Sequence, residues 1–170
     1  MSDPRGTHCA EFDKKFGPNV NQLIDTGAVA ADYYNVANLD GRKNQHYSSR
    51  ASAAAYCVAD QSIDAFRRFH AVLYAQQPRR TAASFPDNAQ LIEVAREAGG
   101  GGNVADCINS GKYTAMVLEL TKAAKFPDTP LVQINGQDYD LNNPRALVDK
   151  VRSIVGDVPG LDVPAPVPPS

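Results

Sequence analysis

The order of hydrophobic patterns along the chain limits its fold more than any other feature of the sequence. Apolar residues follow helical spacing in some stretches and strand spacing in others. The predicted elements are a helix from 9 to about 27, a buried strand within 28–39, a block of helices over 48–125, a strand over 131–134, its hairpin partner over 137–141, and a closing helix from 143. This order predicts an α/β core that carries a helical insertion.

The first helix is expected to begin at Cys9 and to present one apolar stripe at every fourth position, made by Phe12, Phe16, Val20 and Ile24. Gly17-Pro18 should kink this helix rather than end it, because the stripe continues in register. A thiol at a helix N-terminus faces unpaired backbone N–H groups, so we expect the Cys9 thiolate to be favoured. Thiol–disulfide exchange normally uses two cysteines separated by two residues, and the other position holds Gly6.

Local signals define several of the remaining elements. In the helical block, Ser62 and Asp87 are predicted N-caps, helices are expected over 51–60, 104–108 and 112–125, and Tyr113, Met116, Leu120 and Ala124 should face inward. The glycine run 99–102 is expected to be a turn or hinge, since no strand precedes it and no Lys-Ser/Thr follows it as in a phosphate loop. Asn135-Gly136 predicts a tight hairpin, and Asn143 with Pro144 predicts the start of a helix with Leu147, Val151 and Ile154 on one face.

Composition excludes several classes of function. The 170 residues carry a formal net charge of -2, so we expect no nucleic-acid partner. No stretch approaches the roughly 20 apolar residues of a membrane span, and the start at Met1 does not resemble a signal peptide, so the chain is expected to be soluble, without signal or anchor. No metal or other cofactor is expected, because His8 and Cys9 are adjacent and His46 and His70 stand alone.

Seven sequence blocks carry a specific resemblance to a known family, over about 12–161. They are Phe12 with Phe16-Gly17-Pro18, 27–33, 44–51, 56–60, 66–70, 106–113, and Thr129-Pro130 before Asn135-Gly136. In these blocks the chain resembles the membrane-tethered DsbA-like disulfide oxidoreductases of mycobacteria. The resemblance implies a thioredoxin-like fold with an inserted all-helical domain. We expect a core from 1–47 and 126–157, an insertion over 48–125, and a disordered proline-rich tail over 158–170.

The resemblance also implies roles for individual residues. Thr129 and Pro130 match the cis-proline loop, which binds extended substrate segments, and Cys57 and Cys107 match a structural disulfide. Such a bond closes a loop of some fifty residues and would stabilise the fold by roughly 4 kcal/mol in an oxidising compartment. The implied partners are extended segments of cysteine-containing secreted proteins and a membrane reoxidant, and the implied location is the cell envelope.

The chain departs from the family in its redox motif. Cys9 matches the resolving cysteine, whereas Gly6 and Thr7 replace the nucleophilic cysteine and the proline. His8 stands where DsbA enzymes can carry a histidine that stabilises the nucleophile's thiolate, and here it lacks that partner.

The second departure is a missing strand. Family members have a strand immediately before the motif, at the centre of the sheet, but only eight residues precede Cys9 here. If the gap stays open, the two neighbouring strands, which we expect to be parallel, keep backbone groups without hydrogen-bond partners. Each such group costs about 1–3 kcal/mol if it is buried. Either the recorded start is too late or altered, or the gap is filled by a slid strand, by a second copy in a strand-swapped dimer, or by a partner's segment.

Two functions remain open. The first is a cell-envelope thiol–disulfide oxidoreductase, impaired by Gly6 and at most able to form a monothiol adduct through Cys9. The second is a non-catalytic binding or chaperone-like module that keeps the groove and has dropped the redox cycle. A reactive, low-pKa Cys9 would favour the first, and an inert one the second.

Overall fold

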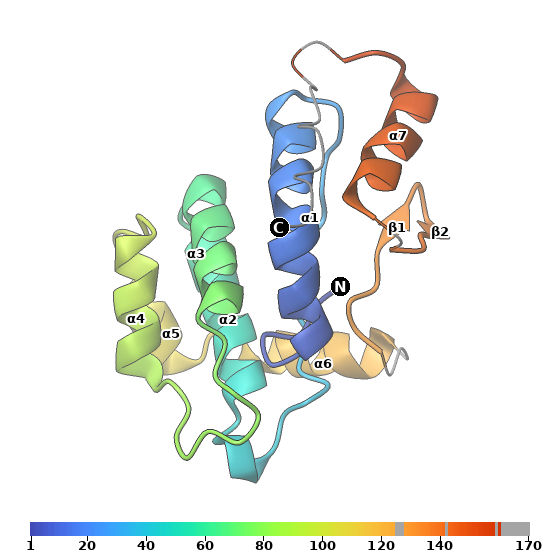
Figure 1. Cartoon of the computed structure of the whole chain (residues 1–170). Coiled ribbons are helices and arrows are strands. Elements are labelled where there is room, and N and C mark those ends of the chain that lie inside the picture. The colour runs from blue at the N-terminus through green and yellow to red at the C-terminus, as the bar shows by residue number, and fades with distance from the viewer. Residues whose placement is uncertain (125–127, 142, 159, 161–170) are drawn as a thin grey trace, which may run out of the picture.

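The protein is mostly helical (Figure 1). The computed structural model describes residues 1–124, 128–141, 143–158 and 160. Its elements are α1 (Thr7–Asp25), the 3₁₀ helix η1 (Arg42–Asn44), α2 (Tyr47–Ala59), α3 (Ile63–Ala75), α4 (Asn88–Glu97), α5 (Val104–Ser110), α6 (Thr114–Ala124), β1 (Gln133–Ile134), β2 (Gln137–Asp138) and α7 (Pro144–Val155). No helix among these residues is both long and apolar enough to cross a bilayer.

Helix α1 runs through the centre of the molecule and continues past Pro18, as the sequence predicts. It begins at Thr7, so Cys9 is its third residue rather than its first. The buried stripe ends on Leu23, and Ile24 is only half-buried. A strict four-residue spacing rotates by about 40° per step, so Leu23 lies closer than Ile24 to the face of Phe12.

Helices α2 to α5 enclose the larger apolar core. Ser62 and Asp87 cap α3 and α4 through hydrogen bonds to the third helical amide, as predicted. Cys57 of α2 and Cys107 of α5 form a disulfide across 50 residues of sequence. In α6 the expected inward face is wrong, because Val117 is the buried residue and Met116 is 37% exposed.

The hairpin and the closing helix form where local signals place them. Asn135 and Gly136 both adopt positive φ, at 51° and 77°, which a tight hairpin turn requires. The strands are shorter than predicted, with two residues each in β1 and β2. Asn143 caps α7, and Leu147, Val148 and Val151 join Phe16 and Leu23 of α1 in a second core.

The strand predicted within 28–39 is not formed. Its only bridge is a parallel one between Ser2 and Asn35, and Ala30, Ala31, Asp32 and Tyr34 are exposed rather than buried. A strand needs a neighbour that supplies hydrogen bonds along its length, and the described residues contain only a two-residue neighbour here. The expected thioredoxin-like sheet is therefore reduced to a hairpin and one bridge.

Candidate functional site

Met1 and Ser2 lie between two segments that are distant in sequence. On one side, Ser2 N–H donates to Tyr34 O and Val36 N–H donates to Ser2 O, both at 2.9 Å. On the other side, Met1 and Leu131 exchange two hydrogen bonds, at 2.7 and 3.0 Å. This exchange is an antiparallel pattern, so the expectation of two parallel neighbours is wrong for the Leu131 side. The first two residues thus bridge the two segments through backbone hydrogen bonds.

Asp3 holds the following turn in place. Its buried carboxylate accepts hydrogen bonds from Arg5 N–H at 2.8 Å, Leu39 N–H at 2.9 Å and Ser48 Oγ at 2.9 Å. Burial raises the pKa of Asp3, and these three donors act in the opposite direction. Gln77 supports the same turn from the loop after α3, because its Nε2 donates to Pro4 O and Gly6 O. Sequence reasoning assigned no role to Asp3 or Gln77, since both act through residues far along the chain.

The Cys9 thiol is buried at the first turns of α1, with 1% of the residue exposed. Burial raises its pKa, while hydrogen bonds from the Thr129 hydroxyl and from Asp3 N–H, at 3.4 Å, oppose the shift. The direction is opposite to the one expected from the helix terminus, because burial raises the pKa of the Cys9 thiol. Cys9 has the character of a poorly ionised, enclosed thiol.

Gly6 lies directly against this sulfur. A Cβ atom at Gly6 would be 2.8 Å from Cys9 Sγ, and Gly6 has φ -70° and ψ 116°, which any residue adopts. Position 6 therefore provides the geometry of a partner cysteine without its thiol.

The Thr129–Pro130 peptide bond is cis, and Thr129 contacts Cys9 through its hydroxyl. Pro130 lines the same groove as Cys9 and Met1. The structure thus brings together four of the residues considered from the sequence, Gly6, Cys9, Thr129 and Pro130.

His8 lies outside this group. Its side chain is 80% exposed, and its Nδ1 lies 3.1 Å from Glu11 on the next turn of α1. His46 and His70 likewise pair with Asp40 and Asp13, respectively. In the described part of the chain no three His, Cys, Asp or Glu side chains form a group that could hold a metal ion.

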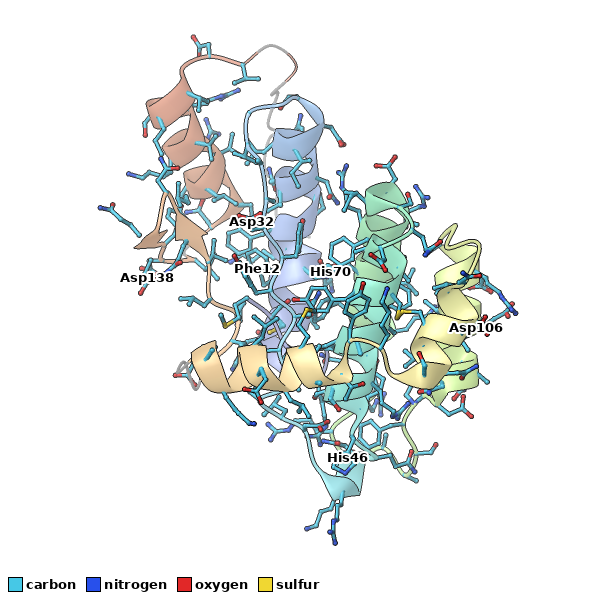
Figure 2. All side chains as sticks on the ribbon, turned by 180° about the vertical axis from the view of Figure 1, so that it is seen from behind. Phe12, Asp32, His46, His70, Asp106 and Asp138 are labelled. Carbon is cyan, nitrogen blue, oxygen red and sulfur yellow. A yellow bond between two sulfur atoms is a disulfide. The ribbon has the colours of Figure 1, made fainter. Side chains whose placement is uncertain are left out.

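A groove of about 1270 Å³ opens above Met1, between the segment 28–34 and the segment 130–136. Figure 2 places Phe12, Asp32 and His70, all from its lining, in the middle of the molecule. In this lining, Asp13 Oδ1 and His70 Nε2 lie 3.5 Å apart. Burial raises the pKa of Asp13 to about 6 and lowers that of His70 to about 4. Sequence reasoning missed this pair, because only the packing of α1 on α3 joins the two residues.

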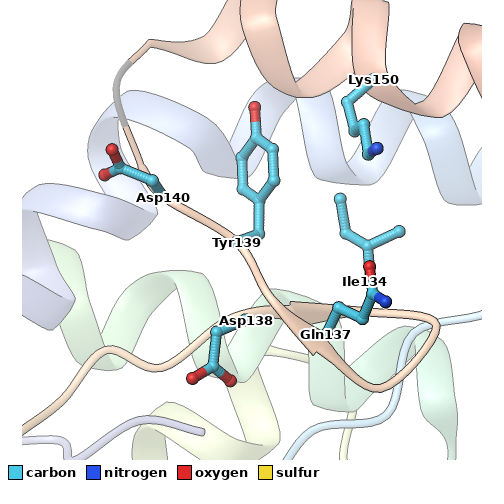
Figure 3. A pocket seen from close by; sticks show the side chains of 6 residues that line it. All are labelled: Ile134, Gln137, Asp138, Tyr139, Asp140 and Lys150. Atoms are coloured by element: carbon cyan, nitrogen blue, oxygen red, sulfur yellow. The ribbon is translucent and has the colours of Figure 1, made fainter.

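A smaller hollow of about 360 Å³ lies between the hairpin and α7 (Figure 3). Tyr139 and Ile134 form its apolar wall, and Asp138, Asp140 and Lys150 surround it. None of the residues that line it is one of the four brought together around Cys9.

Comparison with known proteins places this arrangement among disulfide oxidoreductases. A family model described as thioredoxin matches residues 2–152. The chain is 57% identical to the reduced form of the disulfide bond oxidoreductase DsbG from Mycobacterium tuberculosis, with a TM-score of 0.92 over 95% of this chain and 78% of that one. For reduced DsbA from the same organism the identity is 56%, the TM-score 0.92 and the coverage 95% and 83%.

A curated relative shares a shorter stretch. The serine/threonine-protein kinase PknE of Mycobacterium tuberculosis is 29% identical over 133 residues, which is 76% of this chain. The chain spans 23% of the kinase's length.

Proposed function

The chain belongs to the thioredoxin family, among the DsbA-like disulfide oxidoreductases, and on this basis we propose that it binds extended segments of secreted proteins but is impaired in the dithiol cycle. The observation that carries the proposal is that Gly6, rather than a second cysteine, lies beside the unpaired thiol of Cys9. In that cycle, one thiolate attacks a substrate disulfide and a second expels the resulting mixed disulfide. With Gly6 in the place of the first cysteine, the two-sulfur exchange lacks one sulfur.

The substrate-binding half of the proposal rests on the cis Thr129–Pro130 bond beside Cys9. In this position an extended segment of a substrate can lie along the backbone before Pro130 and bring its own cysteine towards Cys9. Partners of this kind are cysteine-containing secreted proteins. A location outside the cytoplasm fits the Cys57–Cys107 disulfide, because such bonds persist in oxidising compartments.

A second candidate is a binding or chaperone-like module without any redox step. The burial of Cys9 and its raised pKa favour this function, because attack on a disulfide requires an exposed thiolate. The two candidates share the groove and the cis-proline loop and differ only in whether Cys9 reacts.

Thiol titration of the folded chain distinguishes them. We expect Cys9 to react with an aromatic disulfide reagent at least about a hundredfold more slowly in buffer than in urea, as an enclosed thiol does. The Cys9→Ser variant gives the background, because the other two cysteines are paired. Rapid modification at neutral pH would favour the monothiol oxidoreductase. Catalytic insulin reduction by the unmodified sequence, well above that of a free thiol, would contradict the proposed impairment.

A further inference from the structure

The sulfur of Cys9 is covered by the turn 3–6, which leads into α1. Asp3 N–H donates to Sγ at 3.4 Å, and a Cβ atom at Gly6 would lie 2.8 Å from the same sulfur. Both residues are themselves buried, so the two ends of the turn lie between the thiol and other parts of the chain. The closed turn is therefore one reason that only 1% of Cys9 is exposed. On this side a reagent or a substrate sulfur reaches Cys9 only when the turn opens.

The hydrogen bonds inside this turn do not anchor all of it to the rest of the molecule. Gly6 N–H donates to Asp3 O, and Arg5 N–H donates to the Asp3 carboxylate, so both bonds join residues of the turn itself. The same carboxylate ties the start of the turn to α2 and to the segment before it. The part over 4–6 depends on other contacts.

One side chain amide joins that part of the turn to the helical block. Gln77 Nε2 donates to Pro4 O and to Gly6 O, at 2.9 Å each, which uses both hydrogens of its NH₂ group. The backbone that carries this amide is fixed, because Gln77 N–H donates to Tyr74 O in the last turn of α3. Figure 1 shows the chain leaving α3 close to the start of α1. Gln77 thus ties two carbonyl groups of the turn to the end of a helix.

The loop 76–86 makes a second contact with the turn. The guanidinium carbon of Arg5 lies 5.4 Å from the centre of the Phe85 ring, in the geometry of a cation–π interaction. Phe85 is 6% exposed and packs against Tyr47 of α2, so the helical block holds this ring in place. The loop therefore holds the turn at two points, and Gln77 provides the one nearer to Cys9.

We propose that Gln77 is a positioning residue that keeps the turn 3–6 closed over Cys9, so that the loop 76–86 controls access to the thiol. The inference deepens the proposed function, because it concerns reaction at the same sulfur. Loss of the two hydrogen bonds increases the population of the open turn. A thiol that reacts only in the open form then reacts faster in the same proportion. For two neutral hydrogen bonds this factor is about tenfold or more.

Substitution of Gln77 in the full chain tests this role through the rate at which Cys9 reacts with an aromatic disulfide reagent. Gln77→Glu keeps the size of the side chain but replaces its N–H donors by a carboxylate, which repels the carbonyl oxygens of Pro4 and Gly6. We expect a reaction at least about tenfold faster at neutral pH, and a smaller increase for Gln77→Ala. Gln76→Ala is the matched control and should leave the rate unchanged, because the Gln76 side chain is exposed and has no hydrogen bond to the turn in the described structure.

Two further measurements separate opening of the turn from unfolding of the whole chain. Asn143→Ala removes the cap of α7 and lowers global stability without removing a contact of the turn, so Cys9 should react in this variant as in the unmodified chain. Amide exchange gives a readout that does not involve the thiol. Gly6 N–H, which donates to Asp3 O, should exchange at least about tenfold faster in Gln77→Glu than in the unmodified chain.

Three results would overturn the inference. The first is an unchanged Cys9 rate in Gln77→Glu. The second is a faster Cys9 reaction without faster exchange at Gly6, because the turn would then have stayed closed. The third is equal acceleration in Asn143→Ala or Gln76→Ala, since the loss of Gln77 would then have no specific effect. The proposed function is judged instead by the rate of the unmodified chain relative to that in urea and by insulin reduction. A slow Cys9 that no Gln77 variant accelerates therefore overturns this inference alone.

Discussion

The Cα of Gly6 is aimed at the sulfur of Cys9, so that a Cβ atom there would lie 2.8 Å from Sγ. In a disulfide, the Cβ of one cysteine lies about 3.0 Å from the sulfur of the other, as follows from an S–S bond of about 2.04 Å. The two distances differ by little. Position 6 therefore retains the spatial relation that a redox pair with Cys9 requires.

Gly6→Cys should consequently create a disulfide with Cys9 and confer catalytic reduction of insulin, which the unmodified sequence should lack. The backbone at position 6 is extended, as any residue allows, and the close approach to Cys9 Sγ requires only a small shift of the Cys9 side chain. Mass spectrometry and thiol counting would detect the new bond. Gly6→Ser, which adds the same Cβ without a thiol, should remain inactive. A non-reduced Gly6→Cys variant that shows two free thiols beside the intact Cys57–Cys107 bond would contradict this prediction.

Removal of the Asp3 carboxylate should destabilise the fold by about 2–4 kcal/mol, because Asp3→Ala leaves the amides of Arg5 and Leu39 and the Ser48 hydroxyl without their acceptor. Asp3→Asn keeps one oxygen for two of these donors and should cost less. Urea unfolding followed by circular dichroism measures both variants. Equal stability of Asp3→Ala and the unmodified chain would show that the turn does not depend on this carboxylate.

Loss of the Cys57–Cys107 bond should cost about 4 kcal/mol, since the bond closes a 50-residue loop in the unfolded chain. The double variant Cys57→Ala, Cys107→Ala should therefore unfold at a markedly lower urea concentration. Cys9→Ala, which removes the only unpaired thiol of the described residues, serves as a control and should change stability much less. If the two variants unfolded together, the helical block would not need the bond.

Asp13 should make the protein less stable as pH rises. Its pKa is about 6 in the folded state against 3.8 in the unfolded state, so its stabilising effect is complete below pH 3.8 and is lost as pH rises to about 6. Asp13→Asn removes this loss and should stabilise the protein at pH 7 by about 1–3 kcal/mol relative to the unmodified chain. Urea unfolding at pH values from about 4.5 to about 7.5, a range that spans the raised pKa of Asp13, checks the prediction.

His70 acts in the opposite direction over the same range. Its pKa falls to about 4, from 6.5 in the unfolded state, so the stability it contributes is present above pH 6.5 and is lost as pH falls towards 4.

The comparison of Asp13→Asn with the unmodified chain at each pH isolates the carboxyl contribution. A stability difference that is the same at every pH would mean that Asp13 titrates normally.

Local rules predicted those elements whose causes are local. Ser62, Asp87 and Asn143 cap the helices that follow them, and Asn135-Gly136 forms the hairpin turn. In each case the interacting groups lie within four residues, so the sequence contains the whole interaction. The family resemblance, which seven longer blocks of the sequence carry, predicted the thioredoxin-like arrangement of these elements.

Errors arose where a distant partner decides the outcome. The segment 28–39 has the composition of a strand, but strand pairing depends on a neighbour, and Ser2 alone supplies it. The Cys9 thiol lies at a helix terminus as predicted, yet its burial by packing reverses the direction of the pKa shift. The Asp13–His70 pair and the support of Gly6 by Gln77 join residues 57 and 71 positions apart and have no sequence signature.

The position of Met1 between two distant segments has a practical consequence for handling the protein. Its α-amino group donates to Leu131 O, and burial lowers the pKa of this group. A residue fused ahead of Met1 would begin beside the groove that Met1 lines, next to the hydrogen bond with Leu131 O. An N-terminal affinity tag is thus a structural substitution rather than a neutral label, and purification handles belong elsewhere on the chain.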